Sequence, residues 1–327
     1  MPSLHIFNPD HDYALGIGIN VYVSPGKIKR IAKHFEMLPA YWAKDEDYIL
    51  REDNTVCRVA DRQEVDLETI LRSIERIEPW GWDHSLVMRL KALGFCENLL
   101  PDKNELLEMR RLSHRRISID LARHLDFEYV PEECTSLEQA RNFLEREGYA
   151  FFKAPWSSSG RGVVNSRRMP EENLFAWIKG IINKQGSVIA EKGAEKKLDF
   201  ATLWECSEGN VEFKGYSMTM ADDKGQYLGN YCAPQPELER HIRGNTFDSL
   251  DSIVERQRSF ISNKLSNIYE GPLGIDMLVD QSGKIWPSIE INLRNTMGHA
   301  SLAYMRNLEK TNGGVWQKDP YSIFSPL

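Results

Sequence analysis

Four side chains near the end of the chain carry groups that bind metal ions and phosphates. Asp276 and Glu290 are carboxylates, Asn292 is a carboxamide and Arg294 is a cation. Hard oxygen ligands grouped in this way suit Mg²⁺, with Mn²⁺ as the alternative, and protein-bound Mg²⁺ commonly bridges phosphates. These residues predict a metal site with Asp276, Glu290 and Asn292 as ligands and Arg294 one step beyond.

Two predicted strands place these side chains on one face of a hairpin. Residues 274–280 and 284–294 alternate apolar and polar side chains, which is the period of a half-buried strand. The three-residue connection ends in Gly283 and suits a hairpin turn. We expect the polar face to be accessible. An ordinary antiparallel pair also has a polar outer face, so the hairpin alone leaves both interpretations open.

The register of this hairpin depends on Pro287. If Asp280 pairs with Lys284, Asp276 lies opposite Ser288. A proline within a strand marks an edge or a bulge, and a bulge would change the residue that faces Asp276.

A second group of residues is suited to binding phosphate. Residues 148–155 have the composition of a buried strand with one lysine, Lys153. Small residues follow, and their backbone N–H groups can turn toward an anion. The segment lacks the Gly-Lys-Ser/Thr of a Walker A loop and is typical of a flexible loop between two strands, with a mobile surface hairpin as the alternative. The loop residues are Ser157, Ser158, Ser159, Gly160, Arg161 and Gly162.

A third group lies between these two. Residues 187–193 form a predicted strand that ends in Glu191, Lys192 and Gly193, and a further strand begins at Asp199. Backbone groups after Glu191 are placed to contact the edge of an adenine ring, and its carboxylate to accept from the ring's amino group. A lone glutamate at a strand end is ordinarily solvated, so this position counts only together with the others.

Taken in order, the three groups resemble the ATP-grasp superfamily. Lys153 with its loop is similar to the family's phosphate loop, residues 189–193 to its adenine-binding hinge, and residues 274–276 and 290–294 to its metal-binding strands and arginine. The resemblance covers about residues 111–305. It implies an α/β fold with α+β nucleotide lobes: a small N-terminal α/β domain at 1–110, a two-lobed ATP-grasp domain at 111–310, and an irregular tail at 311–327.

The resemblance also implies roles for single residues. Lys153 would bind the α- and β-phosphates of ATP, and the loop after it would close over them. Arg294 would stabilise the transferring phosphoryl group or an acylphosphate, with Arg161 as the weaker candidate. Asp199 would join the nucleotide site.

One family position is ambiguous. Where the family usually has a lysine that contacts the nucleotide, before a helix, this chain offers Arg115 or Arg116.

The implied activity is an ATP-dependent ligase that joins a small-molecule or peptide carboxylate to an amine through an acylphosphate. An ATP-grasp kinase that phosphorylates a hydroxyl is the first alternative, and a nucleotide-binding regulator without turnover is the second. The complete metal set argues against the regulator. Catalysis of this kind is mostly positioning and charge neutralisation.

Composition excludes several other classes. The 327 residues have a net charge of −7, so there is no basic footprint for nucleic acid. The five cysteines are scattered, without a Cys-x-x-Cys pair, so neither a zinc site nor a disulfide framework is indicated. No apolar run is long enough for a membrane span, and we expect a cytoplasmic protein. The oligomeric state is left open.

Three polar clusters have no assigned role. The first lies on a turn after the first predicted strand, the second before a glycine, and the third directly after Arg294. Each could contact substrate, and each has a solvated turn or loop as its alternative. Their members are Asn8, His11 and Asp12; Arg240, His241 and Arg243; Asn295 and His299.

Overall fold

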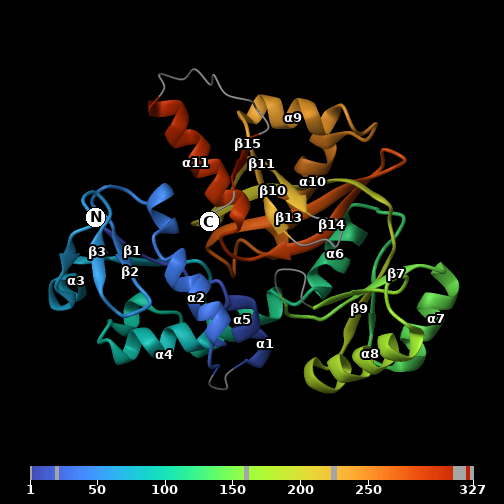
Figure 1. The fold of residues 1–327 in the computed structure, drawn as a ribbon, viewed down its shortest axis with the longest axis horizontal. Coiled ribbons are helices and arrows are strands. Elements are labelled where there is room, and N and C mark those ends of the chain that lie inside the picture. The colour runs from blue at the N-terminus through green and yellow to red at the C-terminus, as the bar shows by residue number, and fades with distance from the viewer. Residues whose placement is uncertain (1, 19–21, 158–161, 222–226, 312–321, 325–327) are drawn as a thin grey trace.

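The chain folds into three β-sheets with helices packed on them (Figure 1). The structure is a computed structural model that describes residues 2–18, 22–157, 162–221, 227–311 and 322–324. The mixture of helices and sheets is the α/β character that the sequence predicted.

The first sheet is built from the N-terminal third. Strand β1 lies parallel to both β2 and β5, and β3 and β4 continue the sheet antiparallel, which leaves β5 as an edge strand. In spatial order the strands are β4 (Glu64–Val65), β3 (Val56–Arg58), β2 (Tyr48–Leu50), β1 (Ser3–Ile6) and β5 (Arg76–Pro79). The helices here are α1 (His11–Ile17), α2 (Gly26–His34), α3 (Leu67–Ser73), α4 (His84–Ala92) and α5 (Lys103–Leu112), with 3-10 turns η1 (Leu38–Tyr41) and η2 (Glu97–Leu99).

The second sheet is antiparallel and lies on the right in Figure 1. Helices α7 (Leu137–Glu147) and α8 (Glu171–Gln185) pack on it through a small core that contains Phe143, Phe152 and Phe175. In spatial order its strands are β6 (Glu132–Cys134), β9 (Val188–Lys192), β7 (Ala150–Lys153) and β8 (Val163–Asn165). The strand pair β7–β8 confirms the prediction of a loop between two strands.

The third sheet is the largest and holds the main core. Helix α10 (Leu250–Lys264) covers one face, and its Phe260 shares a core with Phe200 and Trp204 of the sheet. Helix α11 (Met297–Thr311) packs on β11 and β12, where a Cβ at Gly298 would lie 2.5 Å from Ser217 Oγ. Helices α6 (Arg116–His124) and α9 (Gln235–Arg243) complete the layer. In spatial order the strands are β14 (Ile285–Asn292), β13 (Gly271–Asp280), β10 (Lys196–Ser207), β11 (Asn210–Ala221), β12 (Tyr227–Cys232) and β15 (Ser322–Phe324).

The predicted hairpin forms, with a different register. The backbone N–H of Asp280 donates to Lys284 O at 3.0 Å, as expected. An irregularity between Asp276 and Leu278 then shifts the pairing, so Asp276 faces Glu290 and not Ser288. The expected pairing with Ser288 is therefore wrong, and the bulge near Pro287 is the reason. The shift brings the two carboxylates directly opposite one another.

The end of the chain also departs from the prediction of an irregular tail. Residues Ser322–Phe324 form β15, which pairs with β12, so the prediction is wrong for these three residues. None of the helices in the described ranges is long and apolar enough to span a membrane.

Candidate active site

Lys153 ends the buried strand β7 and forms a buried ion pair. Its Nζ lies 2.8 Å from Glu191 Oε2, and the two side chains are only 7% and 8% exposed. Nζ also donates to Ile289 O at 3.3 Å, which places it one residue from Glu290. Because burying an unpaired charge is costly, this lysine and glutamate compensate one another.

The phosphate loop is described only at its two ends. Ala154 N donates to Gly162 O at 2.7 Å and closes the base of the loop. A Cβ at Gly162 would lie 2.2 Å from Ser157 Oγ, so only glycine fits there. The remaining predicted loop residues, Ser158, Ser159, Gly160 and Arg161, lie outside the described residues.

Arg115 enters the site and Arg116 does not. Arg115 is 5% exposed, and its guanidinium donates to Ser157 Oγ at 2.7 Å and to Glu290 Oε1 at 2.6 Å. Arg116 begins helix α6 with its side chain 52% exposed, and pairs with Glu133 at 2.8 Å. The geometry therefore places Arg115, and not Arg116, beside the predicted phosphate loop and the predicted metal ligand Glu290.

The three predicted metal ligands lie on adjacent strands and face one another. Asn292 Nδ2 donates to Asp276 Oδ2 at 3.1 Å. Burial, with the facing carboxylate of Glu290, raises the pKa of Asp276 to about 7. The expectation of an accessible face is wrong: Asn292 is 6% exposed and the Glu290 side chain 24%.

This donor set fits a hard divalent cation. Two facing carboxylates repel one another, which adds to the effect of burial on the pKa of Asp276, and a cation between them would remove that repulsion. The third oxygen donor is the Asn292 amide. No group of three or more His, Cys, Asp and Glu side chains with metal-binding geometry occurs among the described residues, so Asn292 is needed to complete the set.

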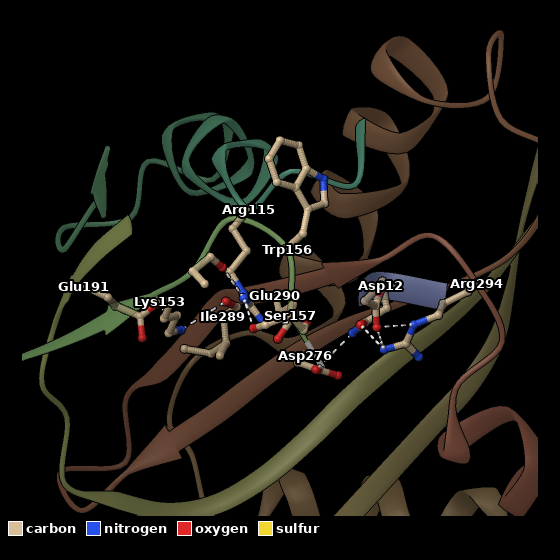
Figure 2. A network of polar contacts seen from close by, with 12 residues as sticks. Asp12, Arg115, Lys153, Trp156, Ser157, Glu191, Asp276, Ile289, Glu290 and Arg294 are labelled. Carbon is tan, nitrogen blue, oxygen red and sulfur yellow. Dashed lines mark hydrogen bonds and ion pairs between the residues drawn. The ribbon is translucent and has the colours of Figure 1, made fainter. Parts of the chain in front are cut away.

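Arg294 joins this face to the N-terminal region. Its Nε donates to Asp12 Oδ2 at 3.0 Å and its guanidinium also donates to Asn292 Oδ1 at 2.9 Å. Burial alone would raise the pKa of Asp12, but Arg294 holds it below its usual value. Figure 2 shows the charged side chains in order across the site: Glu191, Lys153, Arg115, Glu290, Asp276, Asp12 and Arg294.

The predicted hinge residues lie at the end of β9. Gly193 N donates to Tyr149 O at 2.8 Å, and a Cβ at Gly193 would lie 2.2 Å from the Tyr149 ring. The Lys192 ammonium lies 4.1 Å from the centre of the Tyr129 ring. Asp199, near the start of β10, pairs with Lys196, and burial raises its pKa.

The clusters without an assigned role separate into structural and surface residues. Asn8 is buried and donates to Gly81 O at 2.8 Å. His299 accepts from Thr296 N at 3.2 Å at the start of α11. Arg243 makes surface ion pairs with Glu239 and Asp251, which agrees with the alternative of a solvated segment and not with substrate contact. Arg240 pairs with Glu237 on the same helix.

Sequence reasoning missed the support beneath the phosphate loop. The Trp156 ring packs 3.9 Å from the Arg110 guanidinium, and its Nε1 donates to Arg110 O at 3.0 Å. Arg110 also donates to Leu15 O at 2.7 Å, which ties the end of α1 to this loop. A tryptophan directly before a loop of small residues was the available signal.

The comparisons with known proteins agree on the fold. No known family profile matches the chain. It is 26% identical over 176 residues to the butirosin acyl-carrier protein–L-glutamate ligase of Niallia circulans, a match that covers 51% of this chain and 38% of that protein. The match therefore spans well under half of that relative.

Solved structures match over more of the chain. N5-carboxyaminoimidazole synthetase of Staphylococcus aureus with ADP has a TM-score of 0.52 at 11% identity, covering 97% of this chain and 78% of that one. D-alanyl-alanine synthetase A of Vibrio cholerae has a TM-score of 0.50 at 13% identity, covering 95% and 94%. At such identities the similarity concerns the fold alone. The chain has the ATP-grasp fold that its motifs predicted.

Proposed function

We propose that the protein is an ATP-dependent ligase that joins a carboxylate to an amine through an acylphosphate. One observation carries the proposal: the buried cation Lys153 contacts the backbone one residue from Glu290, so a phosphate-binding group and the metal face lie side by side. The relative from Niallia circulans, a carrier-protein–glutamate ligase by name, supports this reaction class.

The chain's own residues supply positioning and charge. We assign Lys153 to the α- and β-phosphates, which requires it to leave Glu191, whose carboxylate then becomes free to accept from the adenine amino group. Arg115 would meet the phosphates from the side of Ser157. Arg294, held by Asp12, would stabilise the transferring phosphoryl group.

Asp276, Glu290 and Asn292 would hold Mg²⁺. When bound, the ion neutralises charge on the phosphate oxygens during transfer. Release of Glu290 from Arg115 would make its carboxylate available to the ion.

The proposed reaction has two steps. The substrate carboxylate oxygen attacks the γ-phosphorus, and ADP leaves with the electrons of the broken P–O bond. The amine then attacks the acyl carbon, a C–N bond forms, phosphate leaves, and the nitrogen loses one proton. Substrates would be small-molecule or peptide carboxylates and amines. The lack of disulfides among the described cysteines and the proposed use of ATP support a cytoplasmic location.

The test is ADP formation with pooled carboxylates, with and without pooled amines. Hydroxylamine added in place of the amines would convert an acylphosphate to a hydroxamate, which can be isolated. Amine-dependent ADP formation and a hydroxamate are expected. A stable phosphorylated product without amine would instead identify a kinase, and no ADP with any pool would contradict the ligase. The Glu290→Gln variant controls for contaminating ATPases.

A further inference from the structure

A cavity of about 460 Å³ lies between the N-terminal sheet and the end of the large sheet. One wall is the edge strand β5 with the turn after it, and the other is the start of β13 with the end of β10. Its volume is in the range of small-molecule sites. The residues assigned above to nucleotide and metal do not line it.

The cavity wall is acidic and aromatic. Among the described residues that line it, Arg76 is the one lysine or arginine, and it pairs with Glu78 at 3.5 Å. A cation with flat or apolar parts would suit such a wall, because carboxylates attract it and tryptophan faces add cation–π attraction. The glutamates are Glu75, Glu78, Glu105, Glu205 and Glu270, and the tryptophans are Trp42, Trp80 and Trp82.

Two side chains in this wall lack partners of their own. The side chain of Glu205, on β10, has neither a hydrogen bond nor an ion pair within the described part of the chain, and burial raises its pKa to about 7. His11 is 2% exposed, and its Nδ1 has no hydrogen-bond partner among the described residues, with Asp83 Oδ2 3.9 Å away. A buried polar group such as His11 Nδ1 ordinarily has a partner, and Glu205 is a partly buried carboxylate, so both groups are available to a ligand in the cavity.

The cavity adjoins the reaction centre through neighbouring residues. His11 lines it, and the next residue, Asp12, holds Arg294. On the other side Asn295 lines it, and Asn295 N donates to Trp80 O at 2.9 Å. A molecule in the cavity would therefore have one end close to Arg294.

We propose that this cavity binds the amine acceptor, and that the acceptor carries at least two amino groups. The proposal rests on the ligase function given above. The reacting amine must be uncharged to attack the acyl carbon and loses one proton as the amide forms. The second amino group takes no part in bond making, stays as an ammonium ion, and lies among the glutamates with Glu205 as its main partner.

Direct binding tests this without turnover. Spermidine, n-butylamine and succinate would each be titrated calorimetrically into the full chain, the parent against Glu205→Gln and Glu68→Gln. Glu68 is a matched control because its side chain, on α3, is 78% exposed and does not line the cavity. We expect spermidine to bind best, and Glu205→Gln alone to weaken it about tenfold or more, since a charged hydrogen bond is lost.

Three results would overturn the proposal. The first is equal spermidine affinity in the parent and Glu205→Gln, and the second is an affinity for n-butylamine or succinate equal to that for spermidine. The third is no spermidine binding at millimolar concentration. ATP affinity should be the same in all three proteins. Glu205-dependent spermidine binding without any ADP formation would retain the cavity as a cation site while rejecting the ligase. Ligase activity with monoamines alone would support the ligase function and reject the proposal that the acceptor carries a second amino group.

Discussion

The carboxylate of Asp12 holds the guanidinium of Arg294, although the two residues are 282 positions apart in the chain. The side chains are 16% and 13% exposed, so the pair is largely shielded from water. Asp12 belongs to the first helix, and Arg294 follows the hairpin of β13 and β14. The N-terminal region thus fixes the direction of a cation that we assign to phosphoryl transfer.

Replacing Asp12 with Asn should therefore lower kcat while sparing ATP binding. Arg294 keeps its bonds to Asn292 and Asn295, so the guanidinium should shift and not be lost. Loss of an orienting partner typically costs about 10- to 100-fold. Steady-state kinetics with a substrate pair should show this fall in kcat with the KM for ATP within about threefold.

A double-mutant cycle separates positioning from a general loss of structure. In an Arg294→Ala background the Asp12→Asn change should have no further effect on kcat, because its target is absent. An equal effect in both backgrounds would show that Asp12 acts independently of Arg294.

Substitutions in the Lys153–Glu191 pair should have separable effects on stability and on nucleotide binding. Lys153→Met leaves a buried carboxylate unpaired, which costs about 3–5 kcal/mol of unfolding free energy. Adding Glu191→Gln should restore most of that stability, while ATP–Mg²⁺ affinity stays at least about tenfold below the parent. Urea unfolding and calorimetry measure the two effects, with Lys179→Met on α8 as an exposed lysine control. A double variant that binds ATP as tightly as the parent would remove Lys153 from the phosphate site.

Glu290→Gln should affect both folding and metal binding. The buried guanidinium of Arg115 keeps an oxygen acceptor but loses a charge, at a cost of about 1–2 kcal/mol. Glu133→Gln is the matched control, since Glu133 is also 24% exposed but pairs with the exposed Arg116; it should cost less than about 1 kcal/mol. ADP formation against Mg²⁺ concentration should show a large loss for Glu290→Gln only. Identical curves for that variant and the parent would refute the metal assignment.

Local patterns predicted the parts of this site that lie within one element. The alternation along the hairpin and the single lysine in a buried strand can each be read over about ten residues. The register between β13 and β14 could not be predicted in this way. The bulge near Pro287 depends on packing, including the hydrogen bond from Ser288 Oγ to Ser118 O at 2.6 Å.

The contacts between segments far apart in the chain have no local sequence pattern from which they could be predicted. Arg115 and Arg116 differ only in which way each points at the start of α6, and that direction is set by the strand that the helix packs on. Asp12 was visible as a turn residue, but its partner could be identified only from the fold.

His299 should make stability fall in mild acid. Burial lowers the pKa of His299 to about 4 from an ordinary 6.5, so between these values the folded chain binds fewer protons than the unfolded chain. Its contribution is complete above about pH 6.5 and is lost as the pH falls toward 4. Protonation would also remove the acceptor for Thr296 N–H and place a positive charge at the N-terminal end of α11, where the helix dipole is unfavourable.

Urea unfolding of the parent and of His299→Asn, which retains an acceptor for Thr296, measures this at pH 7.5 and at pH 5. His114 has a similarly lowered pKa and contributes equally to both proteins, so only the difference between them reports on His299. The parent should lose more unfolding free energy than the variant on going to pH 5. If both lose the same amount, His299 binds its proton equally well in the folded and unfolded chains, and burial at the start of α11 does not lower its pKa.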